Sequence, residues 1–112
     1  MANTKLGGIG VKHIEGNRVG DMAEHYATTW LWDNGYEVFR NCGCTGGVDL
    51  IAISKEGDIK LIDVKSYRSK KGKAYTDVKP TGKRTDEQKK LGVQQLYYNA
   101  ETRKLNWVNH KT

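Results

Sequence analysis

The chain has 112 residues, which is enough for one small domain with a single core. Lys and Arg total 19 against 13 Asp and Glu, and the net charge of +6 suits a polyanionic partner without identifying it. No apolar run reaches membrane-spanning length, no signal-peptide core follows the first residues, and two cysteines do not make a disulfide framework. We therefore expect a cytoplasmic protein, in the host cell if a phage encodes it.

Residues 1–17 are polar and rich in glycine, which predicts a flexible basic arm ahead of the folded part. Such an arm is either a disordered terminus or a segment that touches nucleic acid or a second subunit. The single domain would then cover residues 18–112.

Apolar residues recur every three or four positions from residue 18 to residue 34, which predicts a helix that Gly35 ends. Glu24 lies at the edge of the apolar stripe, one turn after Gly20. A lone glutamate in such a place is ordinary, so its interest depends on acids elsewhere in the chain.

Three strands are expected next. Residues 36–40 predict the first, and the β-rich runs 47–54 and 59–66 predict a hairpin across a short polar link that contains Gly57. Apolar residues on both faces of these runs predict a sheet that is covered on both faces or packs against a second subunit.

Each run of the hairpin carries a carboxylate, Asp49 or Asp63, where a buried strand should be apolar. A buried charge is costly unless a cation or hydrogen bonds compensate it. Asp63 and Lys65 are two residues apart, so their side chains leave the strand on the same face. Two acids and a lysine at one end of a hairpin suggest a divalent-metal site for phosphate chemistry.

The glycine-rich loop 41–47 contains Cys42 and Cys44. A structural zinc site needs four ligands, and no second pair of closely spaced Cys or His residues exists, so a loop near the substrate is the favoured reading.

Residues 65–84 hold eight Lys and Arg against one acid, Asp77. The stretch is either a solvated surface loop or a segment that contacts phosphates, and its position after the two aspartates favours the second reading. The candidate DNA-binding residues are Arg68, Lys70, Lys71, Lys73, Lys79, Lys83 and Arg84.

Thr85 and Gln88 match a capping box, which predicts a helix from residue 85 to about residue 100. This capping role accounts for Gln88 without any function. Residues 104–110 predict a last strand. The expected fold is therefore α/β, in the order αβββαβ, around a mixed sheet of about four strands.

Glu24 on a helix, then Gly47-Val48-Asp49, then Asp63-Val64-Lys65 resembles the signature of the PD-(D/E)XK nuclease superfamily. The αβββαβ order also matches the restriction-endonuclease-like core of that superfamily. The neighbouring residues look most like its intron-associated endonuclease and archaeal Holliday junction resolvase branches. Val48 stands in place of a proline and Asp63 in place of a glutamate, and neither departure removes a ligand.

The resemblance implies catalytic roles for Glu24, Asp49, Asp63 and Lys65. Asp49, Asp63 and the backbone carbonyl of Val64 would bind Mg²⁺ or Mn²⁺, Glu24 would bind a second ion or its water, and Lys65 would orient the attacking water. The products would carry a 5′-phosphate.

Three functions remain open. The resemblance favours a structure-selective endonuclease that acts as a homodimer on branched DNA. A nicking or homing-type enzyme, or a nuclease for single strands or ends, would use the same core. A DNA-binding module without catalysis is least favoured, because all four signature residues are present.

Overall fold

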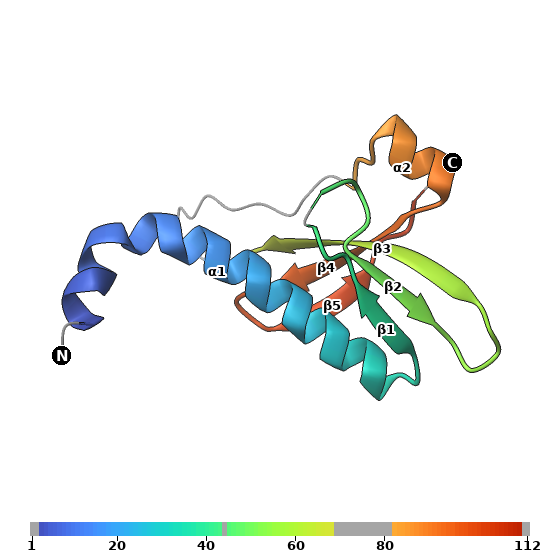
Figure 1. Ribbon diagram of the computed structural model, residues 1–112, viewed down its shortest axis with the longest axis horizontal. Coiled ribbons are helices and arrows are strands. Elements are labelled where there is room, and N and C mark those ends of the chain that lie inside the picture. Colours follow the sequence, from blue (N-terminus) through green and yellow to red (C-terminus); the bar gives the residue numbers. More distant parts are fainter. Residues whose placement is uncertain (1–2, 44, 69–81, 111–112) are drawn as a thin grey trace.

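The computed structural model describes residues 3–43, 45–68 and 82–110, with side chains described from residue 18 onward. Its elements are α1 (Asn3–Asp33), β1 (Glu37–Arg40), β2 (Leu50–Ile53), β3 (Ile59–Tyr67), α2 (Asp86–Leu91), β4 (Gln94–Asn99) and β5 (Lys104–Trp107). The strands form one mixed sheet in the order β1-β2-β3-β4-β5, in which only β3 and β4 run parallel. The α/β prediction is confirmed, with five strands where about four were expected (Figure 1).

Helix α1 begins earlier than predicted. It starts at Asn3 and not at residue 18, so residues 3–17, expected to form a flexible arm, are helical. The glycines in this stretch lower its helix propensity, which is why the pattern pointed to an arm. Despite its length, α1 is not apolar enough to cross a membrane, and neither is any other helix among the described residues.

Gly35 ends α1 as predicted, with a φ of 90° that favours glycine. Its amide donates to the Trp32 carbonyl at 2.9 Å, and the amide of Tyr36 donates to the Leu31 carbonyl at 3.0 Å. These bonds satisfy the last carbonyls of the helix and turn the chain directly into β1.

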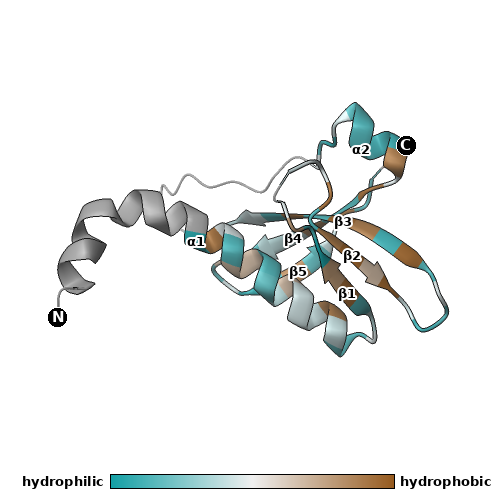
Figure 2. Ribbon diagram, viewed as in Figure 1, coloured by the Kyte–Doolittle hydropathy of each residue, from teal (hydrophilic) through white to brown (hydrophobic). Residues whose placement is uncertain are grey.

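The core lies between α1 and one face of the sheet. Ala27 and Leu31, one helical turn apart, are fully buried against Leu50, Ile62 and Leu96 from the three central strands. Figure 2 shows apolar residues concentrated in β2 and β3, whereas α2 is largely hydrophilic. Burial of this apolar face therefore fixes how the hairpin sits under α1.

The predicted helix 85–100 is wrong in its second half. Both capping-box bonds between Thr85 and Gln88 are present, but the helix ends at Leu91 because Gly92 adopts a left-handed conformation. The chain then enters β4, which pairs in parallel with β3. The residues expected to form the buried stripe of a helix, including Val93, Leu96 and Tyr97, are buried in or beside a strand instead.

The face of the sheet opposite α1, the far face, is apolar at one end and polar at the other. The strand register places Phe39, Ile51 and Leu61 side by side on it. Two residues further along β3, the same face presents Asp63. The far face thus has an apolar end and a polar end, and the candidate site lies at the polar end.

Candidate active site

Asp49 stands where β2 separates from β3. Its amide donates to the Ile62 carbonyl at 2.7 Å, and its carbonyl accepts from the amide of Asn41 at 2.9 Å. The amide of Val64, just beyond the last β2–β3 pair, donates to Oδ2 of Asp49 at 2.7 Å. The side chain of Asp49 thereby continues the ladder after the backbone of β2 has ended, which holds its carboxylate beside β3.

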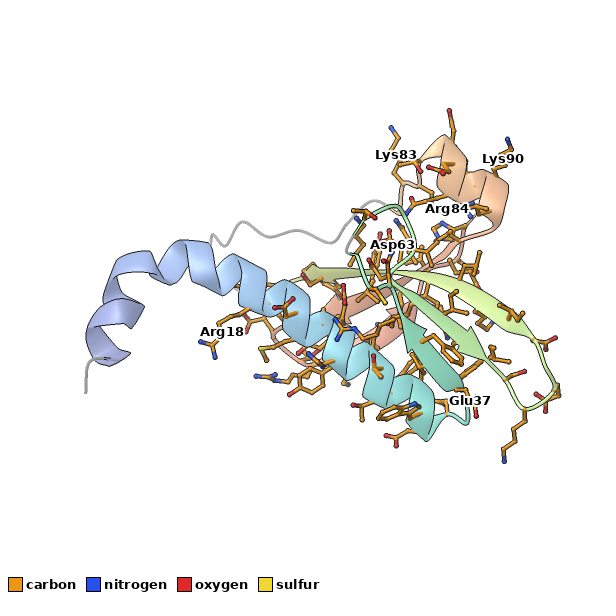
Figure 3. The ribbon with its side chains drawn as sticks, viewed as in Figure 1. Arg18, Glu37, Asp63, Lys83, Arg84 and Lys90 are labelled. Atoms are coloured by element: carbon orange, nitrogen blue, oxygen red, sulfur yellow. The ribbon has the colours of Figure 1, made fainter. Side chains whose placement is uncertain are left out.

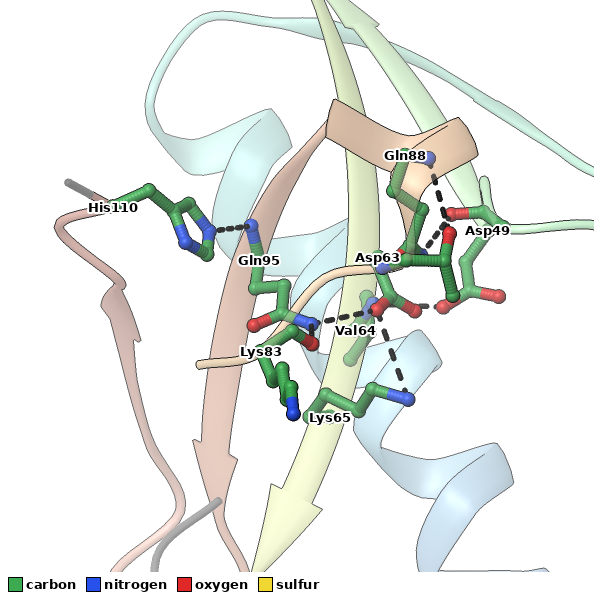
Figure 4. Close-up of polar contacts among 10 residues, drawn as sticks. Asp49, Asp63, Val64, Lys65, Lys83, Gln88, Gln95 and His110 are labelled. Carbon is green, nitrogen blue, oxygen red and sulfur yellow. Dashed lines mark hydrogen bonds and ion pairs between the residues drawn. The ribbon is translucent and has the colours of Figure 1, made fainter. Parts of the chain in front are cut away.

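The carboxyl groups of Asp49 and Asp63 face each other and share a hydrogen bond (Figure 4). The pKa of Asp49 is raised from 3.8 to about 6, chiefly by burial and also by the negative charges of Asp63 and Glu24, while the hydrogen bond from the Val64 amide acts to lower it. Two adjacent carboxyl groups concentrate negative charge at this point, and a divalent cation bound between them would neutralise that charge.

Lys65 reaches the acidic pair from the solvent side. As predicted from their spacing, Asp63 and Lys65 leave β3 on the same face, and the ammonium Nζ lies 3.7 Å from Oδ2 of Asp63. The lysine side chain is half exposed while that of Asp63 is nearly buried, so the amine lies where a substrate from solvent would meet it.

Glu24 faces the site from α1 but does not join the pair closely. Its Oε1 accepts a charged hydrogen bond from Nη2 of Arg40 at 3.1 Å, and its charge contributes to the raised pKa of Asp49. In the parts of the chain that the structure describes, no three Asp, Glu, His or Cys side chains gather as a metal-binding group. The structure therefore brings together Asp49, Asp63 and Lys65, with Glu24 at the edge.

Gln95 is a site residue that the sequence reasoning missed. It is almost fully buried on β4, and its Nε2 donates to Oδ2 of Asp63 at 3.1 Å and to the Lys83 carbonyl at 3.2 Å. Its Oε1 is buried and has no hydrogen-bond partner within the described ranges. Once residues 94–99 are read as a strand parallel to β3, an amide directly opposite Asp63 becomes a visible signal.

Gln88 has a second contact besides its cap. Its Nε2 donates to the Gly47 carbonyl at 2.8 Å, which ties α2 to the loop just ahead of Asp49. A Cβ on Gly47 would lie 2.7 Å from Cγ of Gln88, so the close approach requires glycine. This contact fixes the backbone that carries Asp49.

Of the predicted DNA-binding residues, Arg68, Lys83 and Arg84 are in the described part, and Lys70, Lys71, Lys73 and Lys79 lie outside it. Figure 3 shows Lys83 and Arg84 beside α2, at the end of the sheet that carries Asp63. Lys83 is exposed, whereas Arg84 is half-buried and donates from Nη1 to the Val93 carbonyl at 2.9 Å. Arg84 therefore also fixes the segment that leads into α2.

A helix across a mixed five-stranded sheet is consistent with a protein of the restriction-endonuclease-like fold. The model of the archaeal Holliday junction resolvase (Hjc) family matches residues 15–91, which is more than half of the chain. The chain therefore belongs to the Hjc family, within the PD-(D/E)XK nuclease superfamily, and the resemblance is confirmed. No curated protein and no solved structure matches the chain.

Proposed function

We propose that this protein is a metal-dependent endodeoxyribonuclease that cleaves branched DNA such as a four-way junction. The observation that carries the proposal is the Asp49–Asp63 pair with Lys65 beside it, on a core of the Hjc family. A phosphodiester repels an anionic nucleophile, so its hydrolysis needs positive charge at the phosphate and a positioned water.

The donor set of the site suits Mg²⁺ or Mn²⁺. The carboxylates of Asp49 and Asp63 and the backbone carbonyl of Val64 would hold the ion, and all three donate hard oxygen. The ion, when bound, would polarise the phosphate and lower the pKa of water. The surroundings of the pair support this fit, because burial and the neighbouring charge of Asp63 raise the pKa of Asp49, and a divalent cation between the two carboxylates would offset both effects.

The protein groups around the pair would orient the reaction. Lys65 would place its ammonium against the phosphate or the attacking water, and Gln95 would hold the carboxylate of Asp63 in one orientation. Glu24 would contribute from α1 as a ligand for a second ion, which requires its carboxylate to leave Arg40. We expect products with a 5′-phosphate. We also expect Lys83, Arg84 and the rest of the basic stretch to contact phosphates of the DNA backbone.

We further propose that the protein acts as a homodimer through the apolar end of the far face. Phe39 and Ile59 are exposed there, and Ile51 and Leu61 lie half-buried between them. A hollow of about 170 Å³ beside Asp49 is lined by Phe39, Val48 and Ile51. A second copy packed on this end by two-fold symmetry would bury these side chains and present two sites to one branched substrate.

The test is cleavage of four-way junction, flap, duplex and single-stranded DNA, with and without Mg²⁺. We expect Mg²⁺-dependent cuts that favour the junction, and no cuts by the Asp63→Ala variant, which should still bind the junction. A preference for duplex or for single strands and ends would instead favour a nicking, homing-type or end-directed nuclease. Binding without cleavage in either Mg²⁺ or Mn²⁺ would leave a DNA-binding module.

A further inference from the structure

A polar hollow lies on the other side of β4 from the Asp49–Asp63 pair. It has a volume of about 370 Å³, and its lining includes Lys83, Arg84, Lys89, Asn109 and His110. These residues come from the segment before α2, from α2 itself and from the chain after β5. None of the lining residues is acidic, so the lining of this concave surface carries net positive charge.

One residue connects this hollow to the acidic pair. The amide of Gln95 donates to Nε2 of His110 at 3.2 Å, while its side chain donates both to the Lys83 carbonyl and to Asp63. Figure 4 shows Gln95 between His110 on one side and Asp63 on the other. Because Gln95 is buried and held at three points, the wall of the hollow and the carboxylate of Asp63 keep a fixed relation to each other.

His110 forms the wall of the hollow and does not supply its charge. Burial, and the positive charge of Arg84, lower the pKa of His110 below its usual 6.5. A neutral imidazole is what the bond from Gln95 requires, since Nε2 must accept there. The charges that face the hollow therefore come from Lys83, Lys89 and Arg84.

We propose that this hollow, the second phosphate site, binds a backbone phosphate of the DNA that is being cut, at a fixed offset from the phosphate at the Asp49–Asp63 pair. The identity of the polyanion rests on the proposed function. Lys89 is exposed and would supply its ammonium group to one phosphodiester, while Arg84 is anchored to Val93 and, with Lys83, adds to the local positive field. Two phosphates held by one rigid frame would set the path of the strand through the active site.

Lys89 and its neighbour Lys90 provide a matched pair for the test. Both are exposed lysines in the last turn of α2, but only Lys89 lines the hollow. Binding of a four-way junction is measured over a range of salt concentrations in EDTA, so that no cleavage occurs. Lys89→Ala should weaken binding about eight-fold at 0.1 M salt and lower the slope of log K against log salt by about 0.9, which is the contribution of one phosphate contact.

Lys90→Ala should change the affinity and the slope much less, and Lys89→Arg should retain most of the binding. Equal losses of junction affinity from Lys89→Ala and Lys90→Ala would contradict the proposed second phosphate site. The junction is tested with and without 5′-terminal phosphates, and a Lys89 effect that needs them would also overturn the proposal, because it would indicate capture of a strand end. Cleavage by wild type in Mg²⁺ is scored separately, so loss of the second phosphate site and loss of nuclease function give different results.

Discussion

The two ends of the far face invert the usual relation between polarity and exposure. At the apolar end, Phe39 is 51% exposed and Ile59 is 63% exposed. At the polar end, Asp63 is 6% exposed and Gln95 only 2%. Apolar side chains in solvent and a charged side chain in the interior each require a partner to be stable. Under the proposed function, one end of the face would pack against a second copy of the chain and the other would carry the chemistry.

The far face changes from apolar to polar over two residues of β3. Leu61 and Asp63 are consecutive on the far face. The hydrogen bonds to Asp63 come from two other segments, through Asp49 and through Gln95 of β4, and the cation beside it is Lys65 of β3 itself. The carboxylate is thus held by long-range contacts at a place where the local strand pattern would demand another leucine or valine. Three experiments can break or sharpen this comparison.

The largest effect is expected at the apolar end, from Phe39→Asp. Half-burial of Phe39 in a dimer should contribute about 1 kcal/mol per copy, so its loss from both copies should weaken the dimer by at least about 30-fold. Sedimentation or light scattering over a concentration series measures this change. Because Phe39 is exposed in the single chain, the fold should keep its thermal unfolding midpoint to within a few degrees.

The matched control is Trp32→Asp, which removes an equally exposed aromatic residue from α1, on the other side of the sheet. It should leave the dimer intact. If both substitutions have the same effect on association, or if wild type is a monomer at every concentration, the apolar end is not the interface.

A smaller effect is expected at the polar end, from Gln95→Met. The variant removes the amide that donates to Asp63, so kcat should fall about ten-fold and the acid limb of the pH–rate profile should move to higher pH. Met fills the same volume, and the partnerless Oε1 disappears with it, so the unfolding midpoint should change little. A purely structural residue would instead lose stability without any shift of the pH profile.

Gln94→Met is the control for this experiment. Gln94 is next along β4, points to the opposite face and accepts a bond from Lys60. Its replacement should leave the pH profile of cleavage unchanged. An equal shift in both variants would mean that the strand, and not the Gln95–Asp63 bond, controls the site.

The smallest effect is a change in stability from Asp49→Asn, measured on the protein in EDTA. Because the pKa of Asp49 rises from 3.8 to about 6 on folding, its contribution to stability is present below about pH 4 and is lost as pH rises to about 6. The Asn variant does not lose this stability as pH rises, and its side-chain oxygen can still accept the hydrogen bond from the Val64 amide. Its unfolding midpoint should exceed that of wild type by about 4 °C at pH 8, since the half-buried carboxylate is screened, and the gap should shrink toward pH 4.

Added Mg²⁺ should close the gap at pH 8 by stabilising wild type more than the variant. Asp21→Asn, at an exposed position on α1, should follow the pH dependence of wild type. A constant difference between Asp49→Asn and wild type across the pH range would contradict a raised pKa for Asp49.

The sequence was informative where contacts are local. Two β-rich apolar runs and a turn with Gly57 were enough to predict the hairpin. Because Asp63 and Lys65 are two residues apart in one strand, their side chains could be placed on the same face. The end of α2 was missed because Lys-Leu-Gly-Val-Gln-Gln-Leu-Tyr-Tyr fits a helical stripe unless Gly92 is recognised as a left-handed cap. Gln95 was missed for the same reason, since its contact with Asp63 exists only when β4 pairs with β3 over a long separation in sequence. Where Glu24 sits relative to the pair depends on how α1 packs on the sheet, which periodicity alone does not set.

The parallel pairing of β3 with β4 also sets an order of assembly. A hairpin forms quickly from neighbouring residues, whereas a parallel partner must first cross over through a long connection. During synthesis both carboxylates emerge from the ribosome well before Gln95 can reach one of them. The nuclease would therefore become competent only once β4 has been synthesised and has paired with β3.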